Sequence, residues 1–75
     1  MRLSEAKEGR AFTVVSVTAD DVAVQALRFG IEAGAVVSVA KNISGGPVIV
    51  CKNQLEIAVG RDIACAIEVE QVAGS

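Results

Sequence analysis

A helical pattern ends and a strand pattern begins within one stretch of this chain, Leu27-Arg28-Phe29-Gly30-Ile31-Glu32-Ala33-Gly34-Ala35-Val36-Val37-Ser38-Val39. Gly30 suits the left-handed backbone that closes a helix, which a residue with a Cβ adopts less readily. Gly34 suits the positive-φ position of a tight turn. The stretch therefore predicts a short helix that passes into a β-strand through a corner controlled by two glycines.

Upstream of this corner, the sequence predicts a helix over residues 21–29, with a capping signature at Thr18-Ala19-Asp20-Asp21. Gln25 and Arg28 share the exposed face of this helix, with Val24 between them, and we consider this face the best candidate for a partner-binding surface. The apolar side chains share the other face, which we expect to pack on the core: Val22, Ala23, Ala26, Leu27 and Phe29.

Runs of β-branched or alternating residues predict five strands, separated by Gly, Pro and Asn. Their expected ranges are 11–17, 35–41, 48–52, 55–59 and 66–72. Between the strands, Asn53 suits a hairpin turn, and residues 63–65 fit one helical turn. Leu3 is expected to plug the core.

Five short strands in 75 residues are expected to curl into a small barrel, because curling removes unpaired edges and encloses an aliphatic core. The expected fold class is mainly β. Residues 1–75 would form a single SH3-like barrel domain, with the helix inserted between the first two strands and plugging one end.

The composition excludes several classes of function. The chain has no His, Trp or Tyr and two Phe, and its formal net charge is −2. Without His, acid–base catalysis near neutral pH would need a strongly shifted carboxylate or lysine. The charge and the lack of aromatic residues argue against nucleic acid as a partner. The longest uncharged run, residues 42–51, is too short to insert across a membrane. We expect no catalytic residues and no cofactor.

Two cysteines, Cys51 and Cys65, bear on compartment and on metal binding. Charged residues near the N-terminus rule out a signal peptide, so we expect a reducing, cytoplasmic location and two free thiols. Thiolates are good ligands for soft metals. However, the sequence has no Cys-x-x-Cys and no His. We therefore expect both cysteines to be buried as small hydrophobic residues and assign no metal ligands.

A second candidate contact surface is the loop that contains Gly45, Gly46 and Pro47, since exposed loops on a rigid scaffold often carry function. The abundance of Val and Ile also leaves room for a homodimer, formed through a strand edge or an apolar patch.

The order of these features resembles the ferrous iron transport protein A (FeoA) family over residues 3–72. The family pattern combines a lead-in, a glycine corner, a Gly-Pro loop and a closing Arg-x-x-Ala-x-x-Ile-x-Val. In this chain the matching residues are Leu3, Gly9, Phe29-Gly30-Ile31, Gly34, Gly46-Pro47, Ile57-Ala58-Val59, Arg61, Ala64, Ile67 and Val69.

The resemblance implies an SH3-like barrel and a small cytosolic accessory protein of bacterial ferrous iron uptake. It implies docking on, and modulation of, the cytosolic G-protein domain of the membrane ferrous iron transporter. The family often has an Arg-Leu pair where this chain has Gln25 and Ala26, so Arg28 would supply the basic residue. The same domain type forms the C-terminal module of metal-responsive repressors. The alternative function is therefore a transition-metal-binding or metal-sensing domain.

Overall fold

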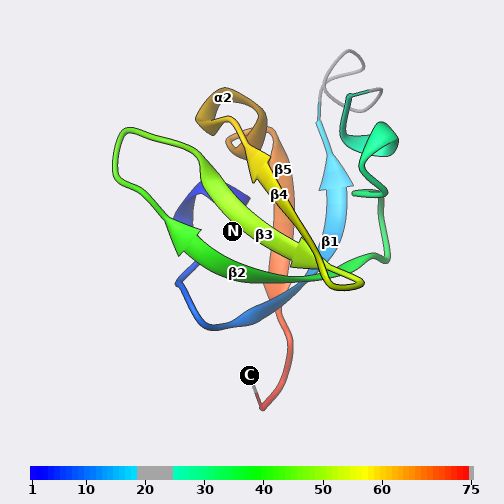
Figure 1. The fold of residues 1–75 in the computed structure, drawn as a ribbon. Coiled ribbons are helices and arrows are strands. Elements are labelled where there is room, and N and C mark those ends of the chain that lie inside the picture. The colour runs from blue at the N-terminus through cyan, green and yellow to red at the C-terminus, as the bar shows by residue number, and fades with distance from the viewer. Residues whose placement is uncertain (19–24, 75) are drawn as a thin grey trace.

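One antiparallel sheet of five strands, in the order β4-β3-β2-β1-β5, forms the body of the computed structural model, which describes residues 1–18 and 25–74 (Figure 1). A 3-10 helix, η1 (Leu3–Glu5), precedes the sheet, and a short helix, α2 (Arg61–Ala64), joins β4 to β5. The five strands are β1 (Ala11–Val17), β2 (Val36–Asn42), β3 (Val48–Lys52), β4 (Leu55–Val59) and β5 (Ile67–Gln71).

All five strands predicted from the sequence are present, each with bounds at or within one residue of those expected. Residues 25–28 are helical, which confirms a helix between β1 and β2. The capping signature and the first part of this helix fall in residues 19–24, outside the described residues. The helical turn after β4 begins two residues earlier than expected.

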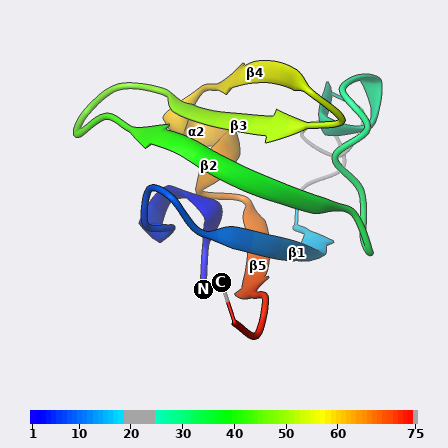
Figure 2. The ribbon, with the colours of Figure 1, turned by 60° about the horizontal axis from the view of Figure 1, so that its bottom comes forward.

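The sheet bends strongly around its core, as expected of a small barrel (Figure 2). The register shifts between Val14 and Ser16 in β1 and between Val39 and Lys41 in β2. Such bulges bend a strand and increase its twist. The two bulges therefore let the sheet curl within a few residues of strand length.

One apolar cluster fills the inside of the curled sheet, and Leu3 is fully buried within it, as predicted. The strands contribute every second residue to the cluster, as their pleat requires. Its members are Leu3, Ala6, Phe12, Val14, Ala26, Ile31, Val37, Val39, Val48, Val50, Ile57, Val59, Ala64, Ile67 and Val69.

The expected core-facing stripe of the helix is wrong in part. Ala26 is buried, but Leu27 is 58% exposed and Phe29 is 51% exposed. The helix ends at residue 28, and residues 29–30 form a turn. A helical wheel therefore no longer places Phe29, and within residues 25–28 only Ala26 reaches the core. Val22 and Ala23 lie outside the described residues.

The glycine corner has the predicted geometry. Gly30 has φ 75°, and its N–H donates to the Leu27 carbonyl at 3.0 Å. The Ile31 N–H donates to the Ala26 carbonyl at 3.0 Å. These two bonds form a Schellman motif, in which a left-handed residue satisfies the last carbonyls of a helix. Gly34, with φ 92°, then occupies the turn that leads into β2.

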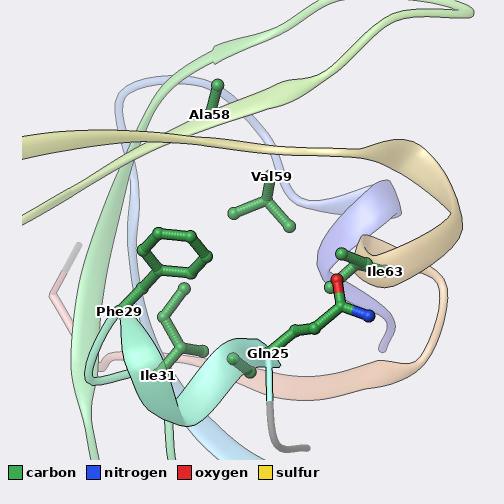
Figure 3. A pocket seen from close by; sticks show the side chains of 7 residues that line it. Gln25, Phe29, Ile31, Ala58, Val59 and Ile63 are labelled. Atoms are coloured by element: carbon green, nitrogen blue, oxygen red, sulfur yellow. The ribbon is translucent and has the colours of Figure 1, made fainter. Parts of the chain in front are cut away.

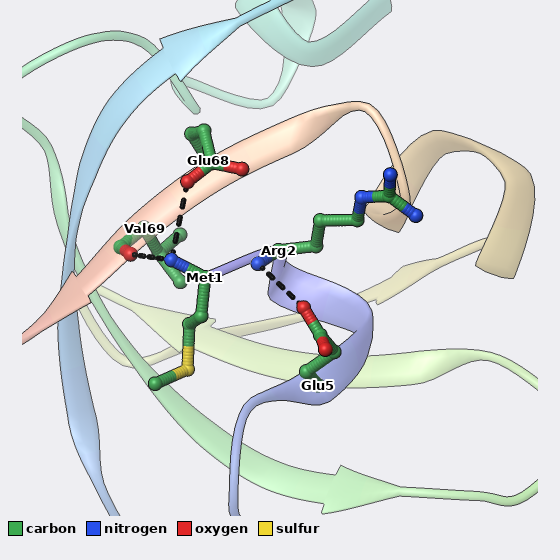
Figure 4. A network of polar contacts seen from close by, with 5 residues as sticks. All are labelled: Met1, Arg2, Glu5, Glu68 and Val69. Carbon is green, nitrogen blue, oxygen red and sulfur yellow. Dashed lines mark hydrogen bonds and ion pairs between the residues drawn. The ribbon is translucent and has the colours of Figure 1, made fainter.

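The outer edge of β5 is covered by the first residues of the chain (Figure 4). Arg2 forms a β-bridge with Glu68, and the Val69 N–H donates to the Met1 carbonyl at 2.7 Å. The terminal ammonium of Met1 donates to Glu68 Oε2 and to the Val69 carbonyl, both at 3.1 Å. Residues 1–2 thus act as a short extra strand, and Leu3 follows them into the core.

Among residues 1–18 and 25–74, no helix is long and apolar enough to cross a membrane.

Candidate partner-binding site

A pocket opens between the helical segment that follows β1, strand β4 and helix α2 (Figure 3). Its empty volume is about 260 Å³, including space open to solvent. No charged side chain among the described residues lines it. The lining residues are Gln25, Ala26, Phe29, Ile31, Ala58, Val59 and Ile63.

Each wall of the pocket follows from local structure. The turn at Gly30 ends the helix and leaves Phe29 at its rim, half exposed. Val59 points inward from β4 and is 4% exposed. Ile63 comes from α2 and packs against the edge of the core. Phe29, Val59 and Ile63 point toward the same hollow, whereas the Ala58 methyl group points away from it (Figure 3).

This arrangement suits an apolar side chain from a binding partner. The lining offers one amide, that of Gln25, and is otherwise apolar. Burying an aliphatic or aromatic side chain contributes about 1.5–3 kcal/mol. The pocket can therefore offer apolar contact to such a side chain.

The three residues predicted on the helix differ in their relation to this pocket. Gln25 lines it. Arg28 is exposed and does not line it. Val24 lies outside the described residues.

The loop predicted as a second contact surface lies at the other end of β3. Gly30 approaches Lys52, the last residue of β3, whereas Gly45, Gly46 and Pro47 precede Val48, the first. At about 3.3 Å per residue, β3 separates the helix and the loop by roughly 15 Å. Both ribbon views place them at opposite ends of the sheet. The structure therefore does not bring the two predicted surfaces together.

Arg61 holds this loop in place. Its Nε donates to the Gly46 carbonyl at 2.9 Å, and its Nη2 donates to the Ile43 carbonyl and to Asn42 Oδ1, both at 2.6 Å. Its Nη1 donates to the Ser4 carbonyl at 3.2 Å. One side chain thus ties η1, the β2–β3 loop and α2 together. The sequence offered Arg61 only as part of the family pattern, because its acceptors are carbonyls that no local pattern reveals.

The expectation that both cysteines are buried is wrong. Both thiols are free, Cys51 is half-buried and Cys65 is exposed. Cys51 alternates with the inward-facing Val50 and so lies on the outer face of β3, whereas Cys65 follows the last residue of α2. In the described part of the chain, no group of three or more His, Cys, Asp or Glu side chains is placed to hold a metal ion.

Sequence reasoning missed Phe29, Val59 and Ile63 as neighbours around one pocket. Two signals pointed toward it. Phe29 immediately precedes the helix-closing glycine, where a side chain leaves the helical pattern. Ile63 is a bulky apolar residue in a short connection, where polar residues are more usual.

The chain thus combines a strongly bent small β-sheet with an apolar pocket at its rim. The chain belongs to the FeoA domain family, whose model matches residues 1–71. This family comprises accessory proteins of iron transport that are generally not enzymes.

Solved structures support the same assignment. The solution structure of the FeoA protein from Chlorobium tepidum is 32% identical, with a TM-score of 0.85, over 100% of this chain and 73% of that chain. Stenotrophomonas maltophilia FeoA, a prokaryotic SH3 domain protein solved with zinc, is 25% identical, with a TM-score of 0.79, over 93% of this chain and 89% of that chain.

A further crystal structure, of an iron uptake regulatory protein (FeoA), shares the fold with a TM-score of 0.88 at 24% identity, over 96% of each chain. The SH3-like fold predicted from the sequence is thereby confirmed. No curated protein matches the chain.

Proposed function

We propose that this chain is a cytosolic accessory protein that docks on the G-protein domain of a membrane ferrous iron transporter and modulates that domain. Family membership supports a role in ferrous iron transport. The observation that carries docking is the uncharged pocket with the half-exposed Phe29 at its rim.

The surroundings of Phe29 have the composition of a protein-binding surface. An aromatic anchor next to an apolar hollow, with polar residues around it, is typical of the centre of an interface. Gln25 lies in the lining, and Arg28 supplies an exposed positive charge on the same helical segment. Leu27, 58% exposed, extends the apolar surface. We assign Gln25 and Arg28 to the rim of the docking surface.

The loop of Gly45, Gly46 and Pro47 is the second proposed contact. Arg61 donates hydrogen bonds to the Gly46 and Ile43 carbonyls and so holds the loop backbone in place. The loop therefore loses little conformational entropy on binding. A partner that touches both surfaces must span the length of β3.

The test is an NMR titration of the isotopically labelled chain with the cytosolic domain of the cognate ferrous iron transporter, with and without a GTP analogue. We expect saturable shifts at Gln25, Phe29 and Ile63, and smaller shifts in the loop. A titration without shifts in both nucleotide states overturns docking on that domain.

A matched pair of variants localises the contact. Phe29→Ala removes the aromatic anchor, and we expect binding to weaken at least tenfold, because interface anchors of this type commonly contribute about 2 kcal/mol or more. Val36→Ala removes a similarly exposed side chain, 55% against 51%, that does not line the pocket. It should leave affinity unchanged. Equal effects of the two variants contradict the assignment to the pocket.

A further inference from the structure

Strand β4 presents unpaired main-chain groups at the edge of the sheet. It pairs with β3 through a two-residue turn, Asn53 and Gln54, whose φ angles are 51° and 68°. In such a hairpin the residues that flank the turn, Lys52 and Leu55, form a hydrogen-bonded pair. Hydrogen-bonded and non-bonded pairs then alternate. The N–H and C=O groups of Glu56 and Ala58 therefore point away from β3, toward the open edge.

No backbone group among the described residues is hydrogen-bonded to this edge. The sequence led us to expect that curling would remove the unpaired edges. The edge of β4 stays open instead, because β4 and β5 are not paired with each other. A strand edge with a single charge and no Pro or Lys has little protection against pairing. On β4 that charge is Glu56.

The opposite edge of the same sheet is covered by a segment of the chain itself. On β5, Met1 and Arg2 pair as an extended strand, and Leu3 then inserts fully into the core. The covering element thus combines main-chain pairing with one buried aliphatic side chain. On β4 the same two components are present, namely the unpaired groups and the adjoining apolar pocket.

The pocket lies where an added strand would direct a side chain. Successive side chains of a strand point to opposite faces, and Val59 points into the pocket while Ala58 points away (Figure 3). In a strand paired with β4, the residue opposite Ile57 or Val59 would point to the pocket side. The pocket is shallow and its lining is apolar apart from Gln25, so it suits contact with one apolar side chain of such a strand.

We propose that β4 accepts an extended segment of the partner domain as an additional strand, which places one aliphatic side chain against the apolar lining of the pocket. This inference rests on the proposed function and specifies its binding mode, β-strand addition. Glu56 favours a Lys or Arg at the position directly opposite, since opposite charges stabilise cross-strand pairs.

A second copy of this chain is a poorer occupant than a partner segment. The inward-facing residues of its own β4, Ile57 and Val59, are 7% and 4% exposed because they already pack in their own core. A second β4 could pair through its backbone but would leave the pocket empty.

The test measures amide hydrogen exchange of the labelled chain alone and with the transporter's cytosolic domain. We expect the domain to slow exchange of the Glu56 and Ala58 amides at least tenfold. The matched variants are Ala58→Pro, which removes the edge N–H, and Ala58→Thr, which keeps it. Proline is tolerated at an edge where its nitrogen faces away from the ladder, so both variants should fold.

We expect Ala58→Pro to bind about tenfold more weakly than Ala58→Thr, because the two variants change the same position and only proline removes the edge N–H. If the domain binds but the two amides stay unprotected, or the two variants bind equally, strand addition is overturned and docking stands. If both amides are protected before the domain is added, a second copy occupies the edge and the proposal is also overturned. If the domain does not bind, both the proposed function and this inference fail.

Discussion

Arg61 donates hydrogen bonds to four separate acceptors in three segments. Lysine keeps the charge but has no planar fork to reach them together. Arg61→Lys should lower the free energy of unfolding by about 2 kcal/mol, measured by urea unfolding with far-UV circular dichroism. Arg28→Lys, on an exposed residue, is the control and should change it by less than about 0.5 kcal/mol. Similar losses in the two variants would contradict the role given to Arg61.

Gly30 combines a left-handed backbone with a close neighbour. A Cβ built there would lie 2.6 Å from Lys52 Nζ, the mobile end of a flexible side chain. Gly30→Ala should therefore cost about 1 kcal/mol, mostly from the backbone. Gly9→Ala is the matched control, since Gly9 has φ 80° and nothing within 4 Å of the added Cβ. Thermal unfolding of both variants should give similar losses. A much larger loss at Gly30 would show that Lys52 cannot move aside.

At the scale of elements, the strand that covers β5 is held by burial rather than by charge. Leu3 is fully buried, whereas the Met1–Glu68 ion pair is 42% and 44% exposed. Leu3→Ala should cost about 3 kcal/mol, and Glu68→Gln less than about 0.5 kcal/mol. Both losses can be read from urea unfolding. The opposite ranking would mean that the ion pair anchors this segment.

The strands and the glycine corner could be predicted from the sequence, whereas the end of the helix could not. The strands were found because a run of β-branched residues or a two-residue period marks each of them, and Gly30 and Gly34 marked the corner because no other residue type suits it as well. The wheel through Leu27 and Phe29 failed because it assumed that the helix continued to residue 29. Where a helix ends, periodicity ceases to assign faces, and only the turn geometry places the side chain.

For the whole molecule, the site was less predictable than the fold. Gln25 could be proposed from its place on the helix. The pocket beside it also needs Val59 and Ile63, which follow more than 30 positions later and reach it only through the curl of the sheet. The open edge of β4 could not be predicted either, because a strand pattern does not indicate which strand will lie at the edge of the sheet.

That open edge leads to a prediction about aggregation of the whole molecule. The chain carries a formal net charge of −2, so one added lysine brings it closer to neutrality, which alone favours association. On β4, however, Ala58→Lys places a charge where another strand would pair, and edge lysines oppose such pairing. Ala73→Lys makes the same change of charge at an exposed residue outside the sheet.

During prolonged incubation at high concentration, followed by light scattering, Ala73→Lys should aggregate as fast as the unchanged chain or faster. Ala58→Lys should aggregate more slowly, because blocking the edge outweighs the loss of net charge. If the two variants aggregate equally, aggregation proceeds through another surface, and net charge rather than the β4 edge controls it.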